Sequence, residues 1–197
     1  SSWSSKLIHG GLRYLENYEF KLVAESLRER EVITQIAPSI TKPLPFVIPH
    51  TKKLRSKLLI RLGLFLYDNL GGKTKIPKSS KVIFAEQYQN ILQSKFTEGF
   101  RYYDVQVDDK KLVEMNIDDA KKMGAIIAED TKVINANRID NYWEITLNNN
   151  EKIKSKILIN AAGPWINETL NNVLKINAKK SIRLVRGSHI ITKKLYE

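Results

Sequence analysis

The sequence predicts an α/β fold, and three patterns lead to this prediction. A helical pattern runs from Asp108 to Met123, and short apolar strand patterns follow it. Residues 157–159 (Ile-Leu-Ile) form a continuous apolar run, as expected of a strand that is covered on both faces. A turn of small residues at 160–165 follows this run directly, and the order strand, turn, helix is typical of α/β sheets that bind ligands at the strand ends.

Two helices are expected in the first half of the chain. The first should begin near Tyr18 with Asn17 as its N-cap and end before Pro38. The second is expected at residues 54–70, and Gly71 and Gly72 should stop it. Its helical period places four apolar residues on one side: Leu54, Leu58, Leu62 and Phe65.

The remaining segments are expected to be extended or to form strands. Four of the six prolines fall within residues 38–49, which predicts an extended and irregular stretch there. Residues 73–105 show no clear pattern. Asp108 is the expected N-cap of the helix that ends at Gly124. Strands are predicted at residues 125–128 (buried), 133–136, 142–147 and 153–159, with a turn at 148–150.

The composition excludes several classes of protein. With 197 residues, 42% hydrophobic and 27% charged, the chain is globular and holds one domain or one and a half. Cysteine is absent, which excludes disulfides, thiolate metal sites and a thiol nucleophile. No two of the three histidines (His9, His50 and His189) share a metal-ligand spacing, so no metal is expected. No apolar run is long enough for a membrane-spanning helix.

Positive charge is concentrated in one segment. The net charge is +12, and residues 51–81 contribute +8 of it, with nine lysines and arginines and one acidic residue. Such a concentration suggests a polyanionic partner, which could be a lipid surface, a nucleic acid or an acidic protein. The alternative is an ordinary solvated face. The cations lack interleaved aromatic residues, which disfavours nucleic acid.

Three motifs could carry chemistry, and each has a plain structural alternative. The serine-rich segment before Lys6 and the pair Gly10-Gly11 suit a loop around phosphates, or the segment is only a frayed terminus. Arg13 and Tyr14 follow and could clamp an anion. The turn at 160–165 could admit a flat or phosphorylated ligand, or it is only a tight connection. His189, on a predicted strand, is either a proton acceptor or structural.

Together these motifs resemble the FAD-dependent, quinone-linked glycerol-3-phosphate dehydrogenases. The matching segments follow the family's order at similar spacing over all 197 residues. They are residues 5–16 (SKLIHGGLRYLE), 18–20 (YEF), 29–31 (ERE), 63–68 (GLFLYD), 107–109 (VDD), 160–165 (NAAGPW) and 187–190 (GSHI). The resemblance implies part of a Rossmann-like FAD-binding domain with an inserted mixed α+β substrate or cap region. Residues 1–38 would be an FAD-domain segment, 39–105 the basic cap region, and 106–197 FAD-domain strands and the start of the substrate domain.

The resemblance also implies roles for individual residues. Arg13 would bind the phosphate of glycerol 3-phosphate, with Tyr14 beside it, and His189 would act as base or orienter for the substrate hydroxyl. His9 would lie by the isoalloxazine ring and count among the catalytic residues. The residues implied in FAD binding are Ser2, Ser4, Ser5, Lys6, Leu7, His9, Gly10, Gly11, Ala162, Gly163 and Pro164. Ala162 stands where the family commonly has threonine, and Trp3 is unusual within the serine-rich loop.

The implied activity is oxidation of sn-glycerol 3-phosphate to dihydroxyacetone phosphate, with hydride transfer to FAD and electrons passed to a quinone. The protein would be peripheral on the cytoplasmic face of the inner membrane, and residues 54–70 could lie in an anionic lipid interface. A homodimer is one option for its assembly. No G-x-G-x-x-G motif occurs, so an incomplete and inactive fragment is expected, lacking that N-terminal segment and the C-terminal part. The alternatives are another FAD-dependent amine or hydroxy-acid oxidase of this fold, or a basic nucleic-acid-binding module.

Overall fold

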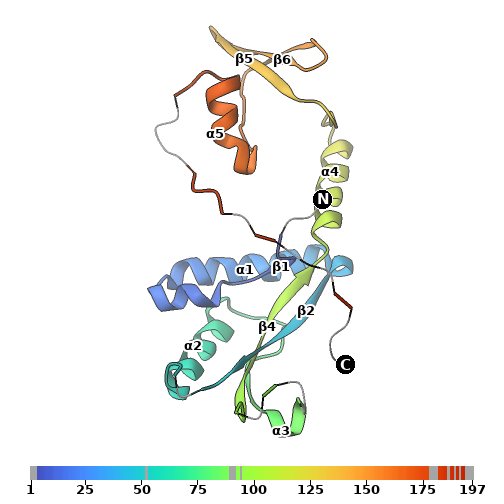
Figure 1. The fold of residues 1–197 in the computed structure, drawn as a ribbon. Helices are drawn as coiled ribbons and strands as arrows, with labels where there is room; N and C mark the ends of the chain where they lie inside the picture. Colours follow the sequence, from blue (N-terminus) through green and yellow to red (C-terminus); the bar gives the residue numbers. More distant parts are fainter. Residues whose placement is uncertain are drawn as a thin grey trace. The chain divides into compact units, whose positions relative to one another are not determined.

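The computed structural model describes residues 4–51, 53–88, 92–93, 95–177, 182–185, 187–188, 190 and 192–193. The chain divides into two compact units, Ser1–Ala125 and Ile126–Glu197, which are coloured blue to yellow-green and yellow to red in Figure 1. Both units combine helices with strands, which confirms the α/β class. The unit boundary falls inside the expected third segment, 106–197, and the assignment of segments to FAD and cap domains stays a prediction.

The sheet of the first unit is built on strand β4 (Glu98–Val107). β2 (Thr41–Pro49) pairs with β4 along its whole length in antiparallel register, from Thr41 opposite Val107 to Pro49 opposite Gly99. β1 (Leu7–Ile8) pairs with the C-terminal part of β4, and β3 (Ser80–Ile83) pairs with its N-terminal part. β3, a short helix α3 (Phe84–Gln87) and β4 thus occupy the segment for which the sequence shows no clear pattern.

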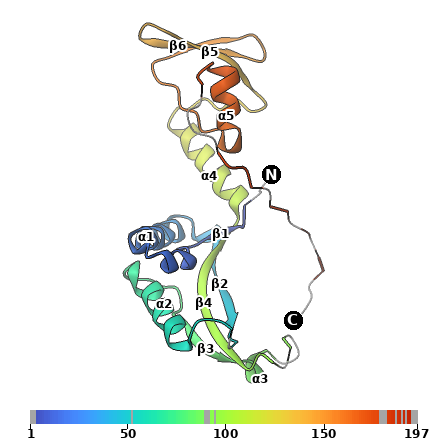
Figure 2. The ribbon, with the colours of Figure 1, turned by 60° about the vertical axis from the view of Figure 1, so that its left-hand side comes forward.

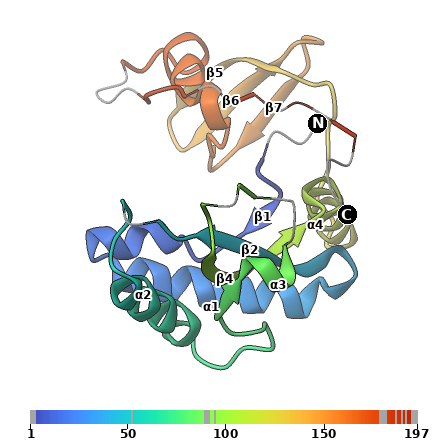
Figure 3. The ribbon, with the colours of Figure 1, turned by 60° about the horizontal axis from the view of Figure 1, so that its bottom comes forward.

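Two helices cover one face of this sheet, as Figures 2 and 3 show. Helix α1 (Phe20–Ile36) follows a 3₁₀ helix, η1 (Leu12–Asn17), and packs against α2 (Lys57–Leu70). Val23 and Leu27 of α1 and Tyr67 of α2 form a buried core cluster. Four partly buried residues pack against this cluster: Leu12, Leu15, Leu70 and Tyr102. Their burial removes apolar surface from water and so holds both helices to the sheet.

The prediction of the first helix is confirmed, but its N-cap is wrong. Asn17 is the last residue of η1, and α1 begins after Glu19, whose side chain makes no capping hydrogen bond. Leu12 and Leu15 explain the difference, because their packing against the core sets a 3₁₀ helix where a cap was expected. Tyr18 then takes a left-handed conformation (φ 61°) between the two helices.

The proline-rich stretch is extended as predicted, but the expectation that it is irregular is wrong. After a short 3₁₀ helix, η2 (Pro38–Ile40), residues Thr41–Pro49 form the regular strand β2. The carbonyl of Ile40 accepts from Asp108 N, and His50 N donates to Glu98 O. Even-numbered residues therefore point their backbone groups toward β4. The strand prolines are all odd-numbered, so their nitrogens face away from the ladder and remove no hydrogen bond from it.

The second helix is confirmed with a later start. Ser56 caps it, because its hydroxyl accepts a hydrogen bond from Leu59 N at 3.3 Å, and the helix ends at Leu70 before Gly71. Leu64 and Tyr67 are the residues that α2 buries. The four apolar residues predicted on one side (Leu54, Leu58, Leu62 and Phe65) are all exposed, and Leu58 is 81% exposed.

The helix predicted from Asp108 is confirmed as α4 (Asp109–Lys122). The Asp108 carboxylate accepts from Lys111 N at 3.1 Å, which is the expected N-cap. Gly124 ends the helical turn with φ 91°, a left-handed conformation that glycine adopts without strain.

The second unit contains an antiparallel meander and one helical segment. β5 (Val133–Ile139), β6 (Tyr142–Leu147) and β7 (Lys152–Ser155) pair in this order, as the sequence predicts, and Asn150 turns with φ 65°. The helical segment consists of η3 (Gly163–Trp165), α5 (Ile166–Glu168) and the π-helical η4 (Thr169–Val173). Val173 joins Ala136, Ile145 and Leu147 in the core of this unit.

One predicted buried strand is wrong, and another is confirmed only in its first part. Residues 125–128 form no strand, and Ile126 is 95% exposed. The strand predicted at 153–159 is confirmed only as far as Ser155, where β7 ends, and the apolar run 157–159 forms no strand, with Ile157 and Ile159 exposed by 72% and 80%. A strand covered on both faces needs neighbouring strands to satisfy its backbone, and the described residues provide no partner strand for either segment.

The carboxylate of Glu98 joins three elements of the first unit and predicts a pH effect. It pairs with Lys57 at the start of α2 and with Lys81 of β3 at 2.7 Å. Hydrogen bonds from the two ammonium groups lower the pKa of Glu98 from 4.5 to about 2. A lowered pKa gives stability that is present above the unfolded pKa and is lost as the pH falls through the folded one.

We therefore expect part of the acid destabilisation between about pH 5 and pH 2 to come from Glu98. In Glu98→Gln, the fall in the urea midpoint over this range should be smaller than in the unaltered protein. Glu114→Gln is the matched control, since Glu114 forms only an exposed pair with Lys110. A pH profile of Glu98→Gln that is parallel to that of the unaltered protein would contradict the assignment.

Candidate functional site

The serine-rich loop is held to the start of α4. Ser4 Oγ donates to Asp109 Oδ2 at 2.6 Å, and Lys6 Nζ lies 3.2 Å from Asp109 Oδ1. The same Ser4 oxygen accepts from Lys6 N at 3.0 Å, and Lys6 has a left-handed backbone (φ 56°). The charge of Lys6, which the resemblance assigns to FAD binding, is therefore balanced by a carboxylate here. Contact with a phosphate would require Lys6 to exchange partners.

Gly10 brings the backbone close to the core. Leu7 and Ile8 pair with β4, His9 is exposed, and Gly10 is buried with its N–H donating to the Tyr67 hydroxyl at 2.8 Å. A Cβ at Gly10 would lie 2.6 Å from Leu27 Cγ and 2.9 Å from Tyr67 Cε2. No side chain fits there, so the close approach of the backbone to Leu27 and Tyr67 requires glycine at this position.

Arg13 and Tyr14 project to the surface from η1. Gly11 turns the chain with φ 71°, and Leu12 and Leu15 pack into the core, which leaves Arg13 and Tyr14 exposed between them. The Arg13 guanidinium has no hydrogen bond or ion pair within the part of the chain that the structure describes. An exposed guanidinium beside a phenol can bind a phosphate through two parallel hydrogen bonds.

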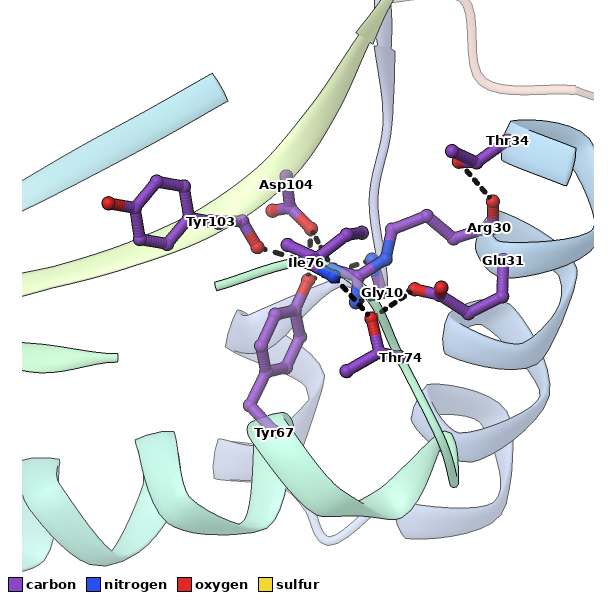
Figure 4. A network of polar contacts seen from close by, with 9 residues as sticks. All are labelled: Gly10, Arg30, Glu31, Thr34, Tyr67, Thr74, Ile76, Tyr103 and Asp104. Carbon is purple, nitrogen blue, oxygen red and sulfur yellow. Dashed lines mark hydrogen bonds and ion pairs between the residues drawn. The ribbon is translucent and has the colours of Figure 1, made fainter. Parts of the chain in front are cut away.

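A buried polar network lies behind this segment (Figure 4). Arg30 Nη1 of α1 lies 3.0 Å from Asp104 Oδ1 of β4, and both side chains are 6% exposed. Tyr67 Oη donates to the same Asp104 oxygen at 2.6 Å. Burial, and then the negative charge of Asp104, raises the pKa of the Tyr67 phenol far above its usual range. The Asp104 carboxylate thus binds Arg30 and Tyr67, and the Tyr67 hydroxyl also binds Gly10 N. The four residues come from four different segments of the chain.

An outer branch ties the loop after α2 to the same network. Arg30 Nη2 lies 3.4 Å from Glu31 Oε1, and Thr74 Oγ1 donates to that oxygen at 2.7 Å. Arg30 Nη1 also donates to the carbonyl of Tyr103 at 3.2 Å. Sequence reasoning did not bring these residues together. Arg30 and Tyr67 do lie in segments that resemble the family, which was the available signal, whereas Asp104 does not.

The second unit carries the other predicted cofactor segment. Ala162, Gly163 and Pro164 follow Asn160, whose side chain accepts from Ala162 N at 3.3 Å and donates to Ile166 O at 3.1 Å. Gly163 has φ 55°, and a Cβ there would meet nothing within 4 Å. The turn therefore leads into a helical segment as predicted, with open space beside Gly163. A groove of about 670 Å³ in this unit is lined by Leu158, Ile159, Asn160, Ala162 and Trp165, among others.

Some predicted residues lie outside the described part of the chain. Ser2 and His189 are among them, so their predicted roles stay predictions. The described residues near His189 (182–185, 187–188 and 190) show no strand. Within the described ranges, no group of three or more His, Asp or Glu side chains could hold a metal ion. Among the same residues, no helix is both long and apolar enough to cross a membrane.

Comparison with known proteins identifies the class of this protein. The model of the family "FAD dependent oxidoreductase" matches residues 1–197, so the chain belongs to the FAD-dependent oxidoreductases. Glycerol-3-phosphate dehydrogenase of Pseudomonas tolaasii is 46% identical over 201 residues, which cover 100% of this chain and 39% of the relative. The predicted resemblance to glycerol-3-phosphate dehydrogenases is confirmed.

Two further relatives have related names. D-erythritol 1-phosphate dehydrogenase of Brucella abortus (strain 2308) is 42% identical, with 100% of this chain and 40% of the relative covered. Aerobic glycerol-3-phosphate dehydrogenase of Escherichia coli (strain K12) is 39% identical with the same coverage. The chain thus spans about two fifths of the length of these curated relatives.

The residues present fit the cofactor of this family. Gly163 leaves open space beside a positive-φ backbone, and a flat or phosphorylated group can approach such a backbone closely. His9 is exposed directly before the buried Gly10, so its imidazole is free to face a bound ring.

The tight packing at Gly10 predicts a stability effect. Gly10→Ala places a methyl group against Leu27 and Tyr67 and should lower the free energy of unfolding by about 1–3 kcal/mol. Gly63→Ala is the matched control, since a Cβ at Gly63 on α2 meets nothing within 4 Å. It should stabilise the helix by about 0.5–1 kcal/mol. Urea unfolding of both variants measures the difference, and equal effects would contradict the packing argument.

Proposed function

We propose that this chain is the part of a flavoenzyme that binds the phosphate of glycerol 3-phosphate. The reaction would convert sn-glycerol 3-phosphate to dihydroxyacetone phosphate and pass the electrons to a quinone. The observation that carries the proposal is the 46% identity to a glycerol-3-phosphate dehydrogenase along the whole chain. The guanidinium of Arg13 supports it, because it is exposed and has no ion pair with any described residue, and a phosphate monoester needs such a partner.

The chain's own residues would position substrate and cofactor. Arg13 would hold the substrate phosphate, with the Tyr14 hydroxyl as an additional donor. FAD would be held by Ser2, Ser4, Ser5, Lys6, Leu7, the backbone of Gly10 and Gly11, and residues Ala162, Gly163 and Pro164. When bound, FAD supplies a hydride acceptor. His189 would accept the proton of the substrate hydroxyl on an imidazole nitrogen, and His9 would orient the reacting groups.

A second substrate of the same chemical class is a candidate. The Brucella abortus relative is named for D-erythritol 1-phosphate, at 42% identity. Both compounds are phosphate monoesters of small polyols, so Arg13 could bind either one. Discrimination would depend on the groups that contact the rest of the polyol.

Flavin reduction tests the reaction directly. Anaerobic addition of glycerol 3-phosphate to the full gene product loaded with FAD should bleach the flavin absorbance near about 450 nm. Free glycerol should not bleach it at the same concentration, since it lacks the phosphate. Arg13→Gln should raise the KM for glycerol 3-phosphate roughly tenfold to a hundredfold, in line with about 1.5–3 kcal/mol for a hydrogen bond to a charged group.

Arg28→Gln is the matched control, because Arg28 is an exposed arginine of α1 outside the proposed site. Its KM should equal that of the unaltered protein. Faster bleaching by D-erythritol 1-phosphate would favour the second substrate, and bleaching only by a D-amino acid or a hydroxy acid would contradict the proposal.

The 197-residue polypeptide alone should neither retain FAD through gel filtration nor turn over. Its apolar residues 157 and 159 are exposed, and no described strand pairs with them.

We also propose that α2 binds an anionic membrane surface on the cytoplasmic side, where a membrane quinone is available. Leu58, Leu62 and Phe65 form an exposed apolar stripe on this helix. Cations precede and follow it, among them Lys53, Arg55, Lys73, Lys75 and Lys78. Apolar area combined with adjacent cations is what an interfacial helix requires.

Vesicle binding tests the membrane proposal. Leu62→Glu should weaken binding to phosphatidylglycerol vesicles at least about tenfold, because burying one leucine contributes about 1.5–3 kcal/mol. Val113→Glu is the matched control, since Val113 is equally apolar and exposed on α4. Cosedimentation at low and high salt separates the apolar contribution to vesicle binding from the electrostatic one. Binding that is unaffected by Leu62→Glu, or weakened equally by Val113→Glu, would contradict the assignment of α2.

A further inference from the structure

The hydroxyl of Tyr67 is a buried group that links the predicted substrate segment to the protein core. Tyr67 is 2% exposed, and its ring packs in the cluster with Val23 and Leu27. Its oxygen is 2.8 Å from Gly10 N and 2.6 Å from Asp104 Oδ1. It therefore bonds on one side to the segment that carries His9 and Arg13, and on the other to the central strand.

We propose that Tyr67 is a positioning residue for substrate binding, which holds residues 9–14 in place through the N–H of Gly10. This inference rests on the proposed function, since it is Arg13 and His9 that are positioned. Tyr67 is buried behind Gly10 in the core cluster, so it acts through the backbone of Gly10.

The directions of the two hydrogen bonds are fixed by chemistry. A backbone N–H can only donate, so Gly10 must use a lone pair of the phenol oxygen. The phenol proton points to the Asp104 carboxylate, to which Tyr67 Oη donates at 2.6 Å. Arg30 Nη1 holds Asp104 Oδ1 in place at 3.0 Å, and burial together with the charge of Asp104 raises the pKa of Tyr67, so the phenol keeps its proton. With these directions the Tyr67 hydroxyl satisfies both Gly10 N and Asp104 Oδ1.

The segment is anchored at two places, with Arg13 between them. Gly10 is held by Tyr67, and Leu12 and Leu15 are held by the core. Gly11 turns between these anchors with φ 71°. If the Gly10 bond is lost, the core contacts of Leu12 and Leu15 remain but the entry to the turn is free to shift. A shift of about 1 Å in a positioning element can cost about a hundredfold in rate.

The test compares Tyr67→Phe with two controls in the full gene product loaded with FAD. Tyr67→Phe keeps the ring and removes only the hydroxyl. Thr74→Val removes two outer bonds of the same network, the one to Glu31 and the one from Ile76 N, without touching Gly10. Val23→Ala opens the same core cluster and lowers stability without changing any hydrogen bond. The readouts are KM and kcat for glycerol 3-phosphate, the flavin absorption spectrum, and deuterium uptake by a peptide that contains Gly10.

We expect Tyr67→Phe to lower kcat/KM about tenfold to a hundredfold, with part of the loss in KM. Deuterium uptake at Gly10 should become at least about tenfold faster, since its amide loses its acceptor. In both control variants, kcat/KM should remain within about twofold of the value for the unaltered protein. The inference is overturned if Tyr67→Phe leaves kcat/KM within twofold, if uptake at Gly10 does not change, or if Val23→Ala reproduces the kinetic loss.

Failure of the proposed function gives a different result. In that case the unaltered protein binds FAD but glycerol 3-phosphate does not reduce it. The flavin spectrum and the exchange at Gly10 then decide the inference. A spectral shift with faster exchange in Tyr67→Phe alone supports positioning of residues 9–14, and an unchanged spectrum overturns it.

Discussion

The buried ion pair between Arg30 and Asp104 is the interaction on which the first unit depends. It joins α1 to β4, and the same carboxylate oxygen accepts a hydrogen bond from the Tyr67 hydroxyl on α2. Removing one partner of such a pair leaves an uncompensated buried charge, which costs about 3–5 kcal/mol. That is a large share of the roughly 5–15 kcal/mol by which a domain is stable. The network therefore fixes the two helices and the central strand as one body.

One glycine and two leucines connect the exposed residues Arg13 and Tyr14 to this body. Gly10 permits close approach to Leu27 and Tyr67, and Leu12 and Leu15 bind the next turn to the core. Arg13 and Tyr14 lie between these contacts and remain accessible. A rigid support with exposed functional groups is the arrangement that catalysis by positioning requires, because the geometry must exist before the substrate binds. The flavin chemistry itself belongs to the cofactor.

Local signals made much of the fold predictable. The Asp108 cap, Gly124 and the meander after it were found because caps, left-handed glycines and alternating strands act over a few residues. The predictions of an N-cap at Asn17 and of an irregular stretch at 38–49 were wrong because both segments depend on tertiary contacts. Leu12 and Leu15 pack on the core and set a 3₁₀ helix before α1. The proline-rich strand β2 pairs with β4, which makes it regular. For the site, residue types indicated Arg13 and Gly10, whereas the meeting of Arg30, Tyr67 and Asp104 depends on contacts far apart in sequence.

A crystal structure of the FAD-loaded full gene product with dihydroxyacetone phosphate tests the central claim most directly. The claim is that a buried network presents Arg13 to the phosphate of the substrate. We expect Arg13 nitrogens within about 3 Å of phosphate oxygens, while Gly10 N remains bonded to Tyr67 Oη. A phosphate held by other residues with Arg13 in solvent, or a Gly10 amide turned away from Tyr67, would contradict it.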